Sequence, residues 1–262
     1  MVFDAELFRR DAPSATMFQA GLSAMLAAQG SAIPAFVGKD MYSKNMHLVD
    51  SSIVRTLRAA QVIFAAVYCH RYGRRLAEPD PNQSFTYNLL LMMSFINEKT
   101  QRPDPKHVLW FEKILLVYAD HEMSCGTFAF LTAASAHSDP LSCYLAGLTT
   151  LYGVIHGGAV DAAYLMLQRV GNLDNVPNLM ADVKKRKEIL YGFGHRIYIA
   201  RDPRAQILLD LLHEIQAEGR TVDPLFAIAE EIDRLASQDS FFQERGVRIN
   251  ADLYMNFACT AM

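Results

Sequence analysis

The sequence has little that would suit a protein working on nucleic acid or on an anionic membrane. Its 25 Lys and Arg residues are outnumbered by 28 Asp and Glu residues, and the formal net charge is −3. Both kinds of partner require a basic surface. We therefore expect no nucleic-acid partner and no membrane partner. With 51% hydrophobic and 20% charged residues, the composition is typical of a globular protein and not of a disordered chain.

Cysteine is scarce as well. The four cysteines are scattered along the chain (Cys69, Cys125, Cys143 and Cys259), and no two of them stand at the spacing of a metal or redox motif. We expect them to be reduced residues of an intracellular protein in the cytoplasm, a mitochondrion or a peroxisome. No two histidines have the His-x-x-x-His spacing of helical metal ligands, so the sequence predicts no metal site.

Residues 140–160 carry no charged side chain, and the run is long enough to cross a membrane. It contains many glycine, serine and threonine residues, which are too polar or too small for a lipid-facing helix. Small residues let helices approach each other closely, so we expect a buried helix in a core or a subunit interface. Charged residues interrupt the first ten positions, which argues against a signal peptide.

Hydrophobic residues recur at helical spacing along most of the chain, and almost none alternate with the period of a strand. The expected helices cover residues 51–72, 84–97, 105–120, 123–136, 140–152, 158–170, 203–218 and 223–237. Asp139 and Pro140 are suited to the start of one of them. The pattern predicts an all-α protein. A stretch rich in Asn, Asp and Pro at residues 172–182 predicts a domain junction.

Residues able to move a proton or bind an anion gather in four segments. They are His121-Glu122 followed by Ser124-x-x-Thr127, then Ile155-His156-Gly157-Gly158-Ala159, then Tyr191-Gly192-Phe193-Gly194-His195-Arg196-Ile197-Tyr198 with Asp202-Pro203-Arg204, and finally Asn250-x-Asp252-x-Tyr254. Each has an ordinary structural explanation when taken singly, because a lone histidine or carboxylate is more often a satisfied polar group than a catalyst. Gly192-x-Gly194 is too short for a dinucleotide-binding fingerprint.

Taken together and in this order, the segments resemble the signature series of the citrate synthase family. The resemblance is strongest from about residue 105 to 257 and implies an all-α, citrate synthase-like fold with a large and a smaller helical domain. It assigns residues 1–156 to the large domain, 157–250 to the small domain and 251–262 to a segment returning toward the large domain. It also implies a homodimer, formed through the uncharged helices at 123–136 and 140–152.

The resemblance implies an acyltransferase of the tricarboxylic acid cycle type. It would condense acetyl-CoA, or a longer acyl-CoA, with oxaloacetate to give citrate or an alkylcitrate plus CoA, without a further cofactor. Matched residue by residue, Asp252 would take the proton from the methyl carbon, His156 would stabilise the enol, and His195 would polarise and protonate the oxaloacetate carbonyl. His121 and Arg204 would hold oxaloacetate. The backbone at Tyr191, Gly192, Phe193 and Gly194 would contact the adenine of CoA.

The chemistry of these residues agrees with such roles. A thioester α-proton is weakly acidic, so Asp252 can remove it only if the enol oxygen is stabilised at the same moment. His156 precedes Gly157-Gly158 at an expected helix start, where an imidazole tends to stay neutral and to donate a hydrogen bond. A dicarboxylate substrate requires cationic and preferably bidentate partners, which arginine supplies.

The sequence also departs from the family pattern. Family members continue beyond the Asn-x-Asp-x-Tyr segment and supply two further arginines for the oxaloacetate carboxylates, and this chain stops at Met262 and also begins late. An alternative function is therefore a catalytically impaired paralogue or fragment that acts only as a helical dimerisation partner. Small or flexible side chains at Met123, Cys125 and Gly126 are compatible with a longer acyl group, and equally with a different packing of the core.

Overall fold

A computed structural model describes residues 8–28, 42–119, 122–153, 156–195 and 198–261 of the chain. Over these ranges the chain forms helices joined by loops, with isolated β-bridges and no β-strand. The prediction of an all-α protein is confirmed. The chain divides into two compact units, residues 1–112 with 121–153 and residues 113–120 with 154–262. The assignment of residues 1–156, 157–250 and 251–262 to the family's domains stays a prediction.

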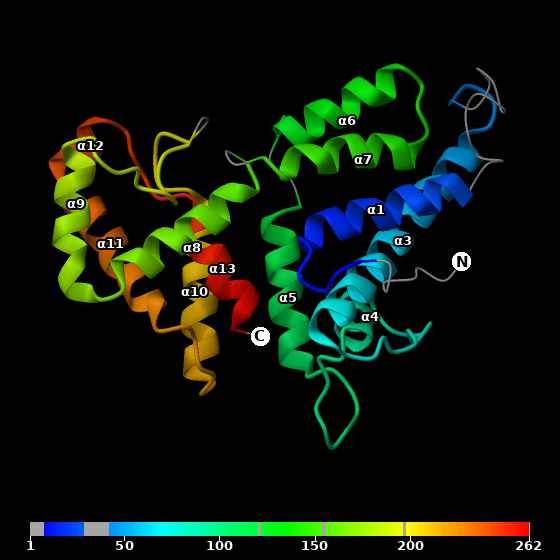
Figure 1. The fold of residues 1–262 in the computed structure, drawn as a ribbon, viewed down its shortest axis with the longest axis horizontal. Coiled ribbons are helices and arrows are strands. Elements are labelled where there is room, and N and C mark those ends of the chain that lie inside the picture. Colours follow the sequence, from blue (N-terminus) through cyan, green and yellow to red (C-terminus); the bar gives the residue numbers. More distant parts are fainter. Residues whose placement is uncertain (1–7, 29–41, 120–121, 154–155, 196–197, 262) are drawn as a thin grey trace. The chain divides into compact units, whose positions relative to one another are not determined.

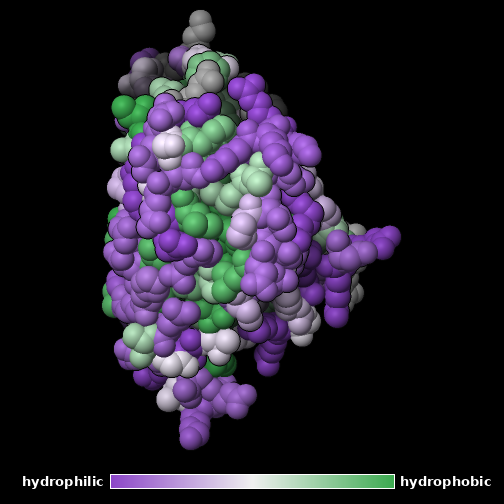
Figure 2. Space-filling view, turned by 90° about the vertical axis from the view of Figure 1, so that its left-hand side faces the viewer, coloured by the Kyte–Doolittle hydropathy of each residue, from purple (hydrophilic) through white to green (hydrophobic). Residues whose placement is uncertain are grey.

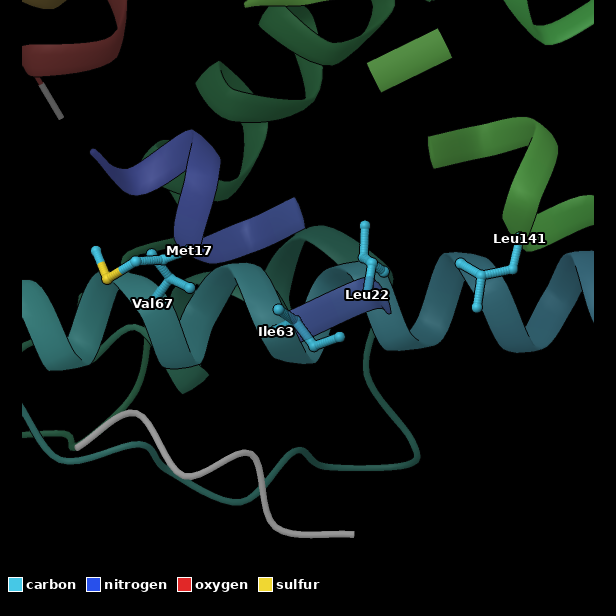
Figure 3. Packing of buried hydrophobic residues seen from close by; sticks show 5 residues of the cluster. All are labelled: Met17, Leu22, Ile63, Val67 and Leu141. Atoms are coloured by element: carbon cyan, nitrogen blue, oxygen red, sulfur yellow. The ribbon is translucent and has the colours of Figure 1, made fainter. Parts of the chain in front are cut away.

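The first unit is built from α1, α3, α4, the first part of α5, α6 and α7 (Figure 1). Their bounds are Ser14–Ala28 (α1), Met46–Tyr72 (α3), Phe85–Met92 (α4), Pro105–Val117 (α5), Cys125–Ser135 (α6) and Pro140–Leu151 (α7). Buried apolar side chains of α1, α3 and α7 form its core (Figure 3), namely Met17, Leu22, Ile63, Val67 and Leu141. Each such side chain removed from water contributes roughly 1.5–3 kcal/mol.

Helices α6 and α7 lie side by side (Figure 1) and approach closely through glycines. A Cβ atom added to Gly147 would lie 2.9 Å from the carbonyl oxygen of Gly126, so any larger residue would force the helices apart. This agrees with the prediction that small residues in the uncharged run allow close helix packing. Large apolar side chains on these two helices are exposed to solvent, including that of Phe128 on α6, which is 64% exposed.

Local signals in the sequence explain where several helices begin. The Asp139 carboxylate accepts hydrogen bonds from the backbone N–H groups of Leu141 and Ser142 and so caps α7, as predicted. Pro105 begins α5, as predicted. The helix expected at residues 84–97 ends at Met92, because Ser94 adopts a left-handed backbone with a φ of 60°.

Among the described residues, α3 is the helix whose length and apolar composition would permit it to cross a membrane. One third of its most apolar window is buried inside the protein. Core helices of globular proteins pass the same test, so this observation is weak support for a membrane span. The uncharged run at residues 140–160 forms α7 and the start of α8 and is not one continuous helix.

The second unit contains the end of α5 and all later elements. Their bounds are Gly158–Val170 (α8), Leu173–Asn175 (3-10 helix η4), Val176–Lys184 (α9), Pro203–Ala217 (α10), Leu225–Gln238 (α11), Ser240–Glu244 (α12) and Asp252–Thr260 (α13). Helix α13 packs against α8, α10 and α11. Seen from the side of α9 and α12, the unit presents mainly hydrophilic side chains with a smaller hydrophobic band between them (Figure 2).

The domain junction expected at residues 172–182 is wrong, because this stretch lies inside the second unit as η4 and α9. Its polar residues start helices. The Asn172 side chain accepts a hydrogen bond from the Asn175 backbone N–H, 3.2 Å away, and a proline stands in the first turn of α9. Asn, Asp and Pro are common both at helix starts and in linkers, so composition alone did not separate the two cases.

Candidate active site

The candidate site is organised around the start of α13, where Asp252 is the first helical residue. A helix N-terminus presents unpaired backbone N–H groups and favours a negative charge. The Asp252 backbone N–H donates to the side-chain oxygen of Asn250, 3.0 Å away. Within the part of the chain that the structure describes, no group donates a hydrogen bond to the Asp252 carboxylate.

The glycine-rich segment that carries His195 pairs with the segment that leads into α13. Phe193 and Ile249 form an isolated antiparallel bridge. The Asn250 backbone N–H donates to the carbonyl oxygen of Gly192 at 2.9 Å, and the Asn250 side-chain amide donates to the carbonyl oxygen of Gly194 at 2.8 Å. Asn250 therefore fixes the position of the glycine-rich loop and of Asp252 at once.

Both glycines of this loop have left-handed backbones, with φ values of 80° for Gly192 and 82° for Gly194. They differ in the space around them. A Cβ atom on Gly192 would lie 2.8 Å from the Cβ of Leu253, the residue after Asp252, whereas no atom lies within 4 Å of the same position on Gly194. Gly192 is therefore required both by its backbone conformation and by the close approach of α13.

Arg204 is held by a buried carboxylate. Asp202 is 0% exposed, and it accepts from Arg204 Nη2 at 2.8 Å and from Arg204 Nε at 3.1 Å. The same carboxylate caps α10 by accepting from the Arg204 backbone N–H, and it accepts from the Ala251 backbone N–H at 3.2 Å. Burial opposes the charged form, but these hydrogen bonds and the guanidinium outweigh it and lower the pKa of Asp202.

Two tyrosine rings flank the Arg204 guanidinium. Its central carbon lies 5.6 Å from the ring centre of Tyr118, just after α5, and 5.9 Å from that of Tyr198. Both are cation–π distances. The Tyr198 ring also stacks on the imidazole of His195, with 4.6 Å between ring centres. His195 Nδ1 accepts a hydrogen bond from the Tyr198 backbone N–H at 3.1 Å, which leaves Nε2 as the nitrogen that can carry the proton.

The electrostatic surroundings of Asp252 follow from these contacts. Burial is the largest influence and raises the pKa of Asp252. The nearby Arg204 charge opposes that rise, the Asp202 carboxylate adds to it, and His156 opposes it. His156 lies in the turn that leads into α8 and is half-buried. Arg204 and His156 therefore both lie within electrostatic range of Asp252, although the three segments are far apart in the sequence.

The same assembly of residues fits what comparison with known proteins finds. The family profile described as "Citrate synthase, C-terminal domain" matches residues 1–262. The chain belongs to the citrate synthase family. The predicted resemblance is thereby confirmed.

Individual citrate synthase relatives cover nearly all of this chain. It is 41% identical over 97% of its length to a citrate synthase-like protein, oryE, of Aspergillus oryzae, which it covers to 57%. It is 35% identical over 97% of its length to an alkylcitrate synthase, phiJ, of a fungal species, which it covers to 55%. The chain thus spans a little over half the length of these relatives.

Solved citrate synthases share the fold. The enzyme of Pyrobaculum aerophilum aligns with a TM-score of 0.82 at 26% identity, over 95% of this chain and 61% of that one. The enzyme of Thermoplasma acidophilum, solved as a ternary complex with carboxymethyl coenzyme A and oxaloacetate, aligns with a TM-score of 0.79 at 24% identity, over 97% and 63% of the two chains. The second likeness shows the fold alone.

The structure places most of the predicted citrate synthase site residues in the second unit. Asp252, His156, His195 and Arg204 lie there, as do Tyr191, Gly192, Phe193 and Gly194. His121 lies outside the described residues. In the ranges that are described, no three His, Cys, Asp or Glu side chains are grouped as a metal site would require.

The second unit also has a cavity of about 320 Å³, and none of the predicted site residues lines it. Its wall includes Arg201 and Asp233, which are joined by two hydrogen bonds of 2.8 Å. The Asp233 carboxylate also accepts from the hydroxyl of the buried Tyr254 at 2.8 Å. We assign no ligand to this cavity, because Arg201 and Asp233 already pair with each other and Arg248 donates to backbone carbonyls.

Several residues of the site were not assigned a role from the sequence. Asp202 and Asn250 stand inside the motifs but carry no reactive role by themselves, and their importance follows from hydrogen bonds to segments far along the chain. Tyr198 is likewise part of a motif. Tyr118 has no signal in the sequence, since a tyrosine near the end of a helix is common. Only the packing of α5 beside Arg204 reveals it.

Proposed function

We propose that the protein condenses an acyl-CoA with oxaloacetate and releases citrate, or an alkylcitrate, and CoA. The observation that carries the proposal is the assembly around α13. There a carboxylate whose pKa is raised by burial lies within electrostatic range of an arginine and of the histidine at the start of α8. Membership in the citrate synthase family supports the same reaction.

The proposed first step is proton removal from the acyl α-carbon by Asp252. A carboxylate in partly buried surroundings is a stronger base than one in water, because desolvation disfavours its charged form. His156 donates a hydrogen bond to the thioester oxygen as the enol forms, which lowers the barrier to carbon acid ionisation. The enol carbon then attacks the ketone carbon of oxaloacetate, and His195 gives a proton to the resulting alkoxide oxygen.

Water then hydrolyses the citryl thioester to citrate and free CoA, which balances the reaction. Arg204, whose guanidinium is held in place by Asp202, is proposed to bind one carboxylate of oxaloacetate. His121 is proposed to assist in holding this substrate. The backbone of Tyr191, Gly192, Phe193 and Gly194 is proposed to contact the adenine of CoA. No further cofactor is required in this scheme, because acyl-CoA enters as a substrate.

The acyl group is proposed to be acetyl or longer. The alkylcitrate synthase among the relatives favours a longer chain, whereas the solved relatives are citrate synthases. A panel of acyl-CoA thioesters from acetyl upward decides between them by kcat/KM. Turnover of acetyl-CoA alone would dismiss the longer chain.

Location and assembly complete the proposal. Both substrates are metabolites of the cell interior, so we propose an intracellular protein. We also propose a homodimer formed through α6 and α7, because exposed apolar side chains such as Phe128 on this pair are suited to a subunit interface. Sedimentation of the wild type beside a Phe128→Asp variant tests it, and an unchanged mass would contradict it.

Release of CoA thiol from acetyl-CoA and oxaloacetate tests the activity directly. We expect turnover by the wild type, and a loss of roughly 10²–10⁴-fold in kcat for Asp252→Asn and for His195→Ala, because each removes a proton-transfer group. Asp210→Asn is the matched control, since this carboxylate is exposed on α10 and accepts a hydrogen bond from the Gln206 side chain. It should retain full activity.

The second candidate function is a non-catalytic partner protein that acts through its helices, and the exposed apolar side chains of the α6–α7 pair favour it. It predicts that the folded wild type shows no turnover with any acyl-CoA of the panel. It also predicts that Asp252→Asn leaves the association state unchanged. A folded but inactive wild type would therefore overturn the enzymatic proposal.

A further inference from the structure

The buried Asp202 carboxylate bonds both to Arg204, the proposed oxaloacetate ligand, and to the backbone just before Asp252, the proposed base. We propose that Asp202 is a positioning residue, which sets the place of the oxaloacetate-binding Arg204 and of the Asp252-bearing end of α13 through one carboxylate group. This inference rests on the proposed function. It assigns to Asp202 a role in the reaction beyond capping α10.

The first line of support is the division of the carboxylate between two elements. Toward α10, it holds the Arg204 guanidinium through Nε and Nη2. Toward α13, it accepts a hydrogen bond from the backbone N–H of Ala251, the residue just before Asp252. Asp202 and Ala251 are 49 positions apart in the sequence. A single rigid group bonded to both elements keeps their separation constant, and catalysis depends strongly on such separations.

The second line of support is that Arg204 has little freedom apart from this contact. Its side chain is 14% exposed, and the rings of Tyr118 and Tyr198 flank it. Two nitrogens of the fork face Asp202, so the guanidinium plane is fixed and its remaining N–H bonds point in set directions. A lysine or a loosely held arginine would offer a dicarboxylate no such defined geometry.

The third line of support is a comparison within the same unit. Asp233 is also a buried carboxylate with a bidentate arginine, Arg201, and it also accepts from α13, through the Tyr254 hydroxyl. It contacts neither Arg204 nor the backbone beside Asp252. Asp233 therefore resembles Asp202 in its burial, its arginine partner and its bond to α13, but it is not proposed to position Arg204 or Asp252. It provides the matched control.

The test measures kcat and the KM for oxaloacetate in wild type, Asp202→Asn, Asp202→Glu and Asp233→Asn, together with the urea midpoint of each. Because small displacements of reacting groups are costly, we expect Asp202→Asn to raise the KM for oxaloacetate and to lower kcat by at least about tenfold each. Asp202→Glu keeps the charge but lengthens the arm, and it should recover KM more than kcat. Asp233→Asn should lose stability to a similar extent and keep both kinetic constants.

A double-mutant cycle separates positioning from direct binding. If Asp202 acts on oxaloacetate through Arg204, adding Asp202→Asn to Arg204→Ala should change the KM for oxaloacetate by less than about twofold. Additive effects would overturn the proposal. So would equal kinetic losses in Asp202→Asn and Asp233→Asn, or a failure of both Asp202 variants to fold while Asp233→Asn folds. An inactive wild type would overturn the proposed function, which is a different outcome from any of these.

Discussion

The two units of the molecule bury polar side chains in different ways. In the first unit the buried side chains of Thr56 and Asp139 bond to nearby backbone. Thr56 donates to the carbonyl of Ser52 one turn earlier in α3, and Asp139 caps the helix that it precedes. In the second unit Asn250 bonds to a carbonyl 56 positions away in the chain. Apolar packing gives a unit its shape, whereas such distant polar bonds fix the position of individual atoms.

This contrast agrees with where the candidate chemistry lies. The described catalytic candidates belong to the second unit, whose buried carboxylates each join separate elements. The core of the first unit is hydrocarbon (Figure 3). Hydrocarbon contacts are non-directional and tolerate small shifts. A reacting group requires directional support, because proton transfer depends on distances within hydrogen-bond reach.

Among these predictions, the largest loss of stability should come from removing hydrogen bonds between residues that are far apart in the sequence. Asp233→Ala leaves the Arg201 guanidinium and the Tyr254 hydroxyl without their shared acceptor, and we expect a loss of roughly 3–5 kcal/mol in the free energy of unfolding. Urea denaturation measures the loss, and hydrogen exchange should locate it in α11 and α13. A loss below about 1 kcal/mol would contradict the idea that such bonds hold the second unit together.

Truncation of a buried apolar side chain in the first unit should give the next largest loss in the free energy of unfolding. Leu22 is fully buried between α1 and α3, and Leu22→Ala should lower the free energy of unfolding by about 3 kcal/mol through lost burial and a residual cavity. Leu57→Ala is the control, since this α3 residue is 55% exposed and should change stability by less than about 0.5 kcal/mol. Similar losses for both would show that burial is not what stabilises this unit.

Substitution of the two left-handed glycines of the second unit should lower the free energy of unfolding by less, and by different amounts at the two positions. Gly192→Ala combines backbone strain with a clash against Leu253 and should cost about 2–4 kcal/mol. Gly194→Ala has the strain but not the clash, so it should cost about 1–2 kcal/mol. Kinetics of both variants sharpen the comparison, because only Gly192→Ala should displace Asp252 and lower kcat. Equal kcat values would argue against close packing at the start of α13.

A local polar bond of the first unit should matter less than a distant one of the second. Asp139→Ala removes the cap of α7, and we expect a loss of about 1–2 kcal/mol in the free energy of unfolding. Asp139→Asn, which retains an accepting oxygen, should restore most of it. A loss equal to that of Asp233→Ala would remove the distinction between local and distant polar bonds.

The smallest expected change is a shift in titration. Burial raises the pKa of Asp252 and Arg204 opposes that rise, so Arg204→Gln should move this pKa further upward. Since the base must be ionised, activity should fall as pH decreases through the raised pKa, above the value of about 3.9 for a free aspartate. Carbon-13 NMR of the labelled carboxyl measures the shift without any need for turnover, with Asp252→Asn assigning the signal. A downward movement would contradict the proposed proximity of Arg204.

Much of the helical framework was predictable, because its signals are local. The helix predicted at residues 158–170 is observed with these bounds as α8, and Asp139 and Pro140 start α7 as expected. Helix α13 was missed, since its nine residues follow a motif and show no long periodic pattern. Residues 172–182 were misread because the same residue types start helices and fill linkers.

The reactive residues were predictable for a different reason. Asp252, His156 and His195 were chosen from family motifs, and the structure brings the first two into electrostatic range, while Tyr198 connects His195 to Arg204. Their assigned roles stay proposals. The supports of these residues could not be predicted, since nothing near Asp202 in the sequence indicates that its carboxylate will meet Ala251. Such partnerships arise only from tertiary structure.

The pairing of Phe193 with Ile249 has a consequence for how the protein comes into being. Closing so long a loop costs entropy that only completed helices between its ends can offset. During synthesis, the glycine-rich loop that carries His195 is therefore made well before its partner, and it can be fixed beside the segment that leads to Asp252 only after Ile249 has been made. A chain cut before residue 248 would lack both Asn250 and Asp252, and with them the proposed base and the residue that positions it.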